Sequence, residues 1–151
     1  TIMVIREFLG LQSGQWDFQI LATDISANAM EKAQNATYHE DSLKNLDPSW
    51  IRKYFVSQGG TYQLKPEIRK EVLFKHFNLM DTIPYHKRFD LIFCRNVMIY
   101  FDQITKNNLV NKFYEAIKPG GYLFIGHSET IQRDQSPFKY IQPSVYQKGG
   151  R

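Results

Sequence analysis

Two polar residues, Arg95 and Asn96, follow directly on an apolar run, and their side chains could hold a charged ligand. The run Phe89–Cys94 is short and mostly apolar, which predicts a strand buried on both faces, as in a parallel sheet. Ligands of open α/β sheets bind outside the carboxyl ends of the strands, so we expect the guanidinium and the amide to face a ligand crevice. The structural alternative is that Arg95 pairs with a nearby acid and Asn96 caps a turn.

A second candidate is Asp24, which ends another predicted strand at residues 17–24. Ser26 then suits the N-cap of a helix over residues 27–36. Strand, terminal acid and helix are typical of the second half of a nucleotide-binding βαβ unit, in which the acid binds ribose hydroxyls. Taken alone, the pattern also fits Asp24 as a turn or cap residue.

Other kinds of catalytic chemistry are disfavoured. The single cysteine, Cys94, lies inside the apolar run, where a thiol is usually inert. The three neighbours His127-Ser128-Glu129 cannot build a catalytic relay on one turn, so we interpret them as a loop at the rim of the site. Neither a P-loop nor a G-x-G-x-x-G motif occurs. Metal binding is disfavoured because the histidines are scattered, at His39, His76, His86 and His127.

Composition sets broad limits. With 151 residues, 42% of them apolar, the chain is long enough for one domain with a sizeable core. The net charge of +4 is mild, which permits an acidic protein partner and gives no indication of nucleic-acid binding. The lone cysteine favours a reducing cytoplasm. No signal peptide or apolar segment of membrane-spanning length is visible.

The remaining pattern predicts an alternating α/β chain with one unusual region. Residues 38–75 are too long for an ordinary crossover connection, so we expect them to contain a small appended subdomain. Its basic residues favour a solvated face, with a docking surface as the less favoured alternative. The other predicted elements are a helix over 1–9 ending at Gly10, a helix from Asp47-Pro48 to about Tyr54, a hairpin of 53–57 with 61–64, a strand over 71–77, a helix over 103–117 capped by Asp102, a strand over 122–125, and an antiparallel pair of 138–141 with 145–147.

Four segments together resemble the CheR family of chemoreceptor protein-glutamate methyltransferases. They are residues 20–26, Asn78-Leu79, 89–102 and 118–129, and the resemblance covers nearly the whole chain. The family implies a class I S-adenosylmethionine-dependent methyltransferase fold. This fold is a Rossmann-like, mostly parallel seven-stranded sheet with a small antiparallel β-subdomain inserted within residues 38–75.

The resemblance also implies the reaction. The methyl group of S-adenosylmethionine passes to glutamate side chains of methyl-accepting chemotaxis receptors, which leaves glutamyl methyl esters and S-adenosylhomocysteine. The implied partner is the cytoplasmic helical region of the receptor, and a receptor tethering peptide is a candidate ligand of the β-subdomain. Nucleic-acid binding and membrane insertion are not implied.

The family assigns roles to seven positions of this chain. The cofactor contacts are Asp24 for the ribose, Asn78 and Leu79 for the adenine, and Arg95 and Asn96 for the methionine portion near the reaction centre, where Arg95 is also a candidate catalytic residue. Tyr100 matches a tyrosine proposed to orient the substrate glutamate, and Arg69 matches a β-subdomain arginine on the active-site side. A carboxylate is already a nucleophile at neutral pH, so orientation by an arginine and a phenol is the help that it needs.

Two departures from the family pattern bear on this interpretation. Ala36 stands where the family often has glycine, which weakens a helix stop. The glycine-rich segment that forms the first strand and the loop at the methionine end of the cofactor is absent. We therefore expect a fragment that lacks this strand and an N-terminal helical domain.

The alternative function is a degenerate CheR-like module that binds S-adenosylmethionine, its product, a receptor peptide or a nucleotide messenger without turnover. Encoded sequence upstream of Thr1 would discriminate the two hypotheses. A methyltransferase acting on DNA or RNA is disfavoured, because the motif expected for base amino-group methylation is absent.

Overall fold

The computed structural model describes residues 1–84 and 88–150, so His86, one of the four scattered histidines, lies outside the described residues. The chain divides into two compact units, Thr1–Asn78 and Leu79–Arg151, and each is described by itself. Among the described residues, no helix has the length and apolar character needed to cross a membrane.

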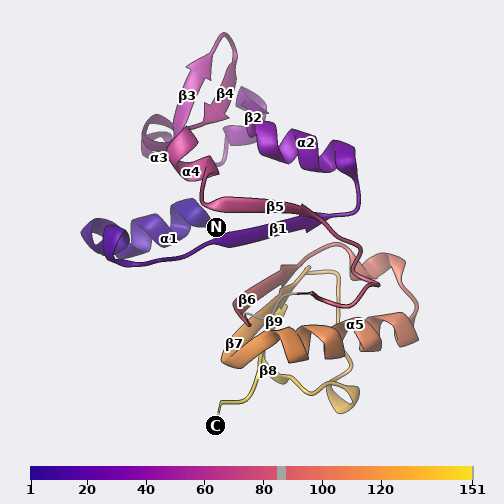
Figure 1. Ribbon diagram of the computed structural model, residues 1–151. Helices are drawn as coiled ribbons and strands as arrows, with labels where there is room; N and C mark the ends of the chain where they lie inside the picture. Colours follow the sequence, from indigo (N-terminus) through magenta and orange to yellow (C-terminus); the bar gives the residue numbers. More distant parts are fainter. Residues whose placement is uncertain (85–87, 151) are drawn as a thin grey trace. The chain divides into compact units, whose positions relative to one another are not determined.

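The first unit contains helices and strands that alternate except at the β3–β4 hairpin (Figure 1). Its elements are α1 (Ile2–Leu9), the 3-10 turn η1 (Gly10–Gln15), β1 (Ile20–Asp24), α2 (Ala27–Asn35), β2 (Thr37–His39), the 3-10 turn η2 (Glu40–Leu43), α3 (Pro48–Tyr54), β3 (Phe55–Gln58), β4 (Thr61–Leu64), α4 (Pro66–Arg69) and β5 (Val72–His76).

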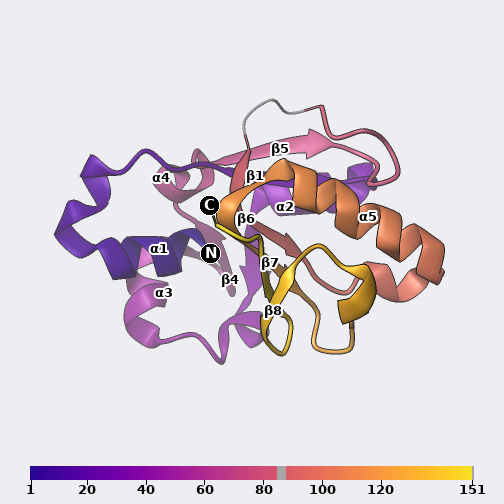
Figure 2. The ribbon, with the colours of Figure 1, turned by 90° about the horizontal axis from the view of Figure 1, so that it is seen from below.

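Strands β1 and β5 form a parallel pair, visible side by side in Figures 1 and 2. The predicted strand over 17–24 is confirmed in part, since β1 begins only at Ile20. The predicted cap of α2 is confirmed, because the hydroxyl of Ser26 accepts a hydrogen bond from Ala29 N at 3.2 Å. The helix ends at Ala36, whose φ of 48° is a left-handed conformation that glycine adopts more readily.

Strands β2, β4 and β3 form a separate antiparallel sheet in that order. The predicted hairpin is confirmed as β3 paired with β4, although residues 53 and 54 belong to α3 instead of the strand. Asp47 caps the amino end of α3, since its carboxylate accepts a hydrogen bond from Ser49 N at 2.7 Å. The buried core of the unit consists of Ile2, Leu43, Tyr54, Phe55 and Ile68.

The second unit is built on a four-stranded sheet with the order β6-β7-β9-β8. Its elements are β6 (Phe89–Cys94), the 3-10 turn η3 (Met98–Tyr100), α5 (Gln103–Ala116), β7 (Ile117–Ile125), the 3-10 turn η4 (Arg133–Gln135), β8 (Lys139–Gln142) and β9 (Val145–Gln147).

The pairing of this sheet is parallel between β6 and β7 and antiparallel elsewhere, so the predicted closing pair is confirmed. Strand β7 begins at Ile117, earlier than the predicted Tyr122. The glycines of this segment were expected to separate helix from strand. Instead, Gly120 N donates to the carbonyl of Lys148 at 3.0 Å, and Lys148 N donates to Gly121 O at 2.9 Å. Pairing with Lys148, which directly follows β9, and pairing of Ile117 with Phe89 of β6 therefore extend the strand.

Helix α5 covers one face of this sheet (Figure 1) and forms one core with it. The fully buried members from the helix and from β7 include Leu109, Leu123 and Ile125. The prediction that β6 is buried on both faces is wrong, because Leu91 is 36% and Phe93 48% exposed. The core of this unit lies on the α5 side of the sheet, and alternate residues of a strand point to opposite faces.

Candidate functional site

The predicted site residues divide between the two units, and their roles stay predictions. The first unit carries Asp24, Arg69 and Asn78, and the second carries Leu79, Arg95, Asn96 and Tyr100.

Asp24 and Asn78 lie at the same edge of the β1–β5 pair. Asp24 is opposite His76 in the parallel register, and Phe77 N donates to the carbonyl of Asp24 at 3.1 Å. Within the part of the chain that the structure describes, the exposed carboxylate of Asp24 accepts one hydrogen bond, from Ser26 N to Oδ1 at 2.8 Å. A carboxylate offers about four lone-pair sites, so this acid has acceptor capacity left for hydroxyl donors such as those of a ribose.

Arg69 does not reach that edge. It ends α4, three residues before β5 begins at Val72, and therefore belongs to the amino end of the strand. Its guanidinium donates from Nη2 to the carbonyl of Gln34 at 2.9 Å. Gln34 lies in the last turn of α2, where a cation is favoured by the helix dipole. Within this unit Arg69 therefore has a structural contact apart from Asp24.

In the second unit, Arg95, Asn96 and Tyr100 lie on one short segment beyond the end of β6. All three are exposed, Tyr100 to 81%. Asn96 has a φ of 61°, a left-handed conformation that asparagine tolerates better than most residues. Since Cys94 pairs with Ile125 in parallel register, this segment and the one that begins at Gly126 leave the sheet at the same edge. This edge gathers a guanidinium, an amide and a phenol that face water.

Glu129 organises the backbone of this edge, a role that the sequence interpretation as a rim loop missed. Its carboxylate is 6% exposed and accepts four backbone N–H groups, which belong to Asn96, Val97, Met98 and Gly126. Burial opposes ionisation, but the four N–H groups outweigh it and hold the pKa of Glu129 below its ordinary 4.5. The signal available in the sequence was an acid three residues after a glycine at the end of a buried strand.

Cys94 is not a nucleophile in this arrangement. The residue is 4% exposed, and burial, with a smaller contribution from the negative charge of Glu129, raises the pKa of its thiol to about 12. The thiolate is the reactive form, so this thiol stays inert at neutral pH.

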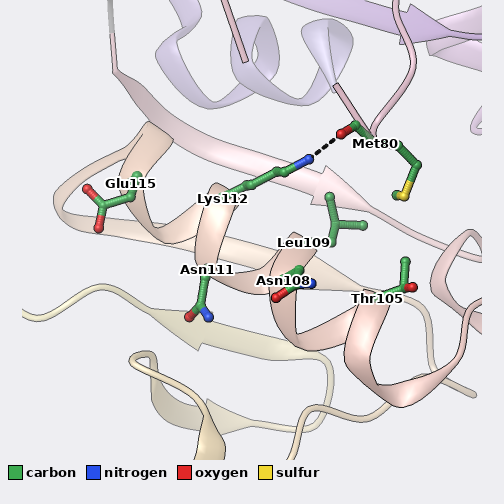
Figure 3. A pocket seen from close by; sticks show the side chains of 7 residues that line it. All are labelled: Met80, Thr105, Asn108, Leu109, Asn111, Lys112 and Glu115. Carbon is green, nitrogen blue, oxygen red and sulfur yellow. Dashed lines mark hydrogen bonds between the residues drawn. The ribbon is translucent and has the colours of Figure 1, made fainter. Parts of the chain in front are cut away.

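Lys112 anchors the segment of residues 79–81, and Figure 3 shows its hydrogen bond to Met80. Its ammonium donates to three successive carbonyls, those of Leu79 at 3.3 Å, Met80 at 2.5 Å and Asp81 at 3.1 Å. Lys112 also lines a groove of about 510 Å³ beside α5, which contains none of the predicted site residues. Because its ammonium is already engaged with these carbonyls, we interpret the groove as part of the anchor.

The chain matches one protein family over nearly its whole length. A family model described as CheR methyltransferase, SAM binding domain, matches residues 2–147. The chemotaxis protein methyltransferase of Borreliella burgdorferi is 44% identical over 149 residues, which are 97% of this chain and 52% of the relative. That of Escherichia coli is 36% identical over 151 residues, which cover 95% of this chain and 51% of the relative. The chain thus spans about half the length of the curated relatives that it matches.

A solved structure supports the fold class. The N-methyltransferase NodS from Bradyrhizobium japonicum superimposes with a TM-score of 0.54, covering 87% of this chain and 74% of that one. Their sequence identity is 10%, so the likeness concerns the fold alone. It agrees with the predicted methyltransferase fold class.

Proposed function

The chain belongs to the CheR methyltransferase family, and we propose that it carries the cofactor-binding and substrate-orienting part of a protein-glutamate methyltransferase that acts on chemotaxis receptors. The observation that carries the proposal is the family match over residues 2–147. The exposed polar side chains at the carboxyl ends of β1 and β6 support it, because this is where α/β sheets bind ligands.

The residues of the chain suit S-adenosylmethionine, the cofactor of this family. Asp24 would accept hydrogen bonds from the ribose hydroxyls, and Asn78 and Leu79 would contact the adenine. Arg95 and Asn96 would hold the methionine portion, whose carboxylate is a natural partner of a guanidinium. When bound, the cofactor supplies a methyl group attached to a sulfonium, an electrophile that requires no metal ion.

The substrate side of the proposal rests on Tyr100. A glutamate carboxylate is ionised at neutral pH and attacks without a general base, so the protein needs only to hold it in line. The exposed phenol of Tyr100 would donate a hydrogen bond to one carboxylate oxygen while the other attacks. The products would be a glutamyl methyl ester and S-adenosylhomocysteine, whose sulfur keeps the electron pair of the S–C bond. Arg69 and the antiparallel β2–β4–β3 sheet are proposed to contact the receptor, including a tethering peptide.

The test is methyl transfer by the full-length gene product. The protein is incubated with methyl-labelled S-adenosylmethionine and a chemotaxis receptor, and the labelled receptor is then treated with mild base. Release of volatile methanol identifies a carboxyl methyl ester. We expect base-labile label on the wild-type receptor and none on a receptor whose candidate glutamates are replaced by alanine.

Arg95→Ala supplies the control on the protein side. We expect it to impair turnover, because the guanidinium is proposed to orient charged groups at the reacting end. Binding of S-adenosylhomocysteine by wild type without any methyl transfer would favour the alternative, a binding module. Label that is stable to base would contradict a glutamyl ester.

A further inference from the structure

The segment beyond β6 is fixed by a buried charge that comes from a distant part of the chain. Each of the two carboxylate oxygens of Glu129 accepts two hydrogen bonds. Oε1 accepts from Val97 N at 2.9 Å and from Met98 N at 2.7 Å. Oε2 accepts from Asn96 N at 3.0 Å and from Gly126 N at 2.5 Å. Three successive N–H groups that converge on one anion form a concave nest, which here encloses a side chain of the same molecule.

Gly126 gives a second, independent sign that the carboxylate is closely fitted. A Cβ atom added there would lie 2.6 Å from Oε2 of Glu129 and 2.6 Å from Oδ1 of Asn96. The backbone of Gly126 is not in the left-handed region, so the requirement for glycine is one of space. The absence of a side chain lets the carboxylate approach both segments.

The residues proposed to hold the cofactor's methionine portion and to orient the substrate flank this nest directly. Arg95 precedes it, Asn96 is part of it, and Tyr100 N donates to the carbonyl of Val97 at 3.3 Å in the turn that follows. The side chain of Tyr100 is 81% exposed, so little of its surface is packed against the protein. Its direction therefore depends on the backbone that Glu129 holds.

We propose that Glu129 is a positioning residue that orients Arg95 and Tyr100 for methyl transfer by fixing the backbone of residues 96–98. The inference rests on the proposed function for its catalytic consequence. The carboxylate of Glu129 is buried and bound by four backbone N–H groups, so its proposed action is through the segment that it binds.

Glu129→Gln is the sharpest test, because it keeps the size of the side chain and changes its hydrogen bonding. An amide has one acceptor oxygen and one NH₂ group, so two backbone N–H groups would face a donor instead of an acceptor. We expect the segment to leave its present conformation. Because misplacement of a catalytic group by about 1 Å can cost about a hundredfold, kcat/KM for the receptor should fall about ten- to hundredfold. Glu115→Gln on the exposed side of α5 is the matched control and should behave as wild type.

A double-mutant cycle with Tyr100→Phe separates positioning from a general loss of stability. If Glu129 acts through Tyr100, removal of the phenol should cost much less in the Glu129→Gln background than in wild type. Additive losses would overturn the proposal, as would wild-type kcat/KM in Glu129→Gln. Should Glu129→Gln fail to fold, Glu129→Asp, which keeps both oxygens on a shorter stem, takes its place in the cycle with the same criteria.

Hydrogen exchange keeps this inference distinct from the proposed function. In the wild-type full-length product, the amides of Asn96, Val97 and Met98 should be protected, and Glu129→Gln should expose them while the core amides of α5 stay protected. This readout needs no enzymatic activity. Absence of methyl transfer by wild type would reject the proposed function, whereas fast exchange of these three amides in wild type would reject the role of Glu129.

Discussion

The carboxyl ends of β1 and β6 both present polar residues, but they are held in different ways. At the end of β1, Asp24 is exposed and bonds to Ser26, two residues away. At the end of β6, the backbone is bound by Glu129, which lies 31 to 33 residues further along the chain. The carboxyl end of β1 is thus exposed to water and held by neighbours in sequence. The backbone at the carboxyl end of β6 is instead held by the buried carboxylate of a residue distant in sequence.

The difference matches what each end is proposed to do. A ribose contact needs an acceptor that water can reach before the ligand arrives, and an exposed acid provides it. Orientation of the charged groups at the reacting end requires that a guanidinium and a phenol keep their directions, which calls for a rigid backbone.

The closed end of β6 predicts that Cys94 resists thiol reagents. With its pKa raised from 9.0 to about 12, the thiolate fraction near pH 8 is lower by about a thousandfold than for an ordinary cysteine. Labelling of the native protein by iodoacetamide should be slower by about this factor, and its rate should keep rising with pH above 9. The same protein in denaturant is the control, and equal rates in both states would show that this end is open.

Gly126→Ala should destabilise the contact between Glu129 and the segment beyond β6. The added methyl would overlap Glu129 and Asn96, so we expect a loss of about 1–3 kcal/mol in the free energy of unfolding, the usual range for overpacking. Gly149→Ala is the matched control, since a Cβ atom there would meet nothing within 4 Å. Chemical denaturation measures both, and equal stability of the two variants would indicate that the carboxylate is loosely held.

Lys112→Met should weaken the anchor of the segment that carries Leu79. The substitution keeps most of the stem and removes the ammonium that binds three carbonyls, at a cost of about 1 kcal/mol in the free energy of unfolding. Lys106→Met on the same helix is the control and should be nearly neutral. Local hydrogen exchange at residues 79–81 should accelerate in the first variant only, and unchanged exchange would show that the anchor contributes little.

Ser26→Ala tests the contribution of the α2 N-cap, which lies next to Asp24 at the end of β1. Loss of the N-cap hydroxyl should lower the free energy of unfolding by roughly 0.5–1 kcal/mol, because the site is exposed. Affinity for S-adenosylhomocysteine should stay close to wild type, since Asp24 accepts from the backbone N–H of this residue and keeps that bond. A large loss of affinity, measured by calorimetry, would mean that the cofactor contact of Asp24 depends on the side chain of Ser26 as well.

The same contrast explains what the sequence could predict. The caps at Ser26 and Asp47 and the hairpin of β3 and β4 depend on near neighbours, and the patterns for them are confirmed. The strand β6 and its polar end were also predicted, because an apolar run followed by Arg95 is a local signal. These are features that a few adjacent residues determine.

Features that depend on distant residues were missed. The role of Glu129 requires knowledge that β6 and β7 pair in parallel, which brings segments about 30 residues apart to one edge. The early start of β7 depends on pairing of Ile117 with Phe89 and of the two glycines with Lys148, which overrides the tendency of Pro119-Gly120-Gly121 to separate elements. The one-sided burial of β6 depends on which face α5 covers, and the apolar run alone does not show it.

The most direct test of the contrast is a kinetic comparison of Asp24→Ala and Tyr100→Phe in the full-length gene product. Asp24→Ala should weaken binding of S-adenosylhomocysteine by about 1.5–3 kcal/mol, the range for a charge-assisted hydrogen bond, because the ribose loses its acceptor. Tyr100→Phe should lower kcat/KM for the receptor while cofactor affinity stays near wild type. Unchanged affinity in Asp24→Ala, or receptor methylation by Tyr100→Phe equal to wild type, would contradict the division of roles between the two strand ends.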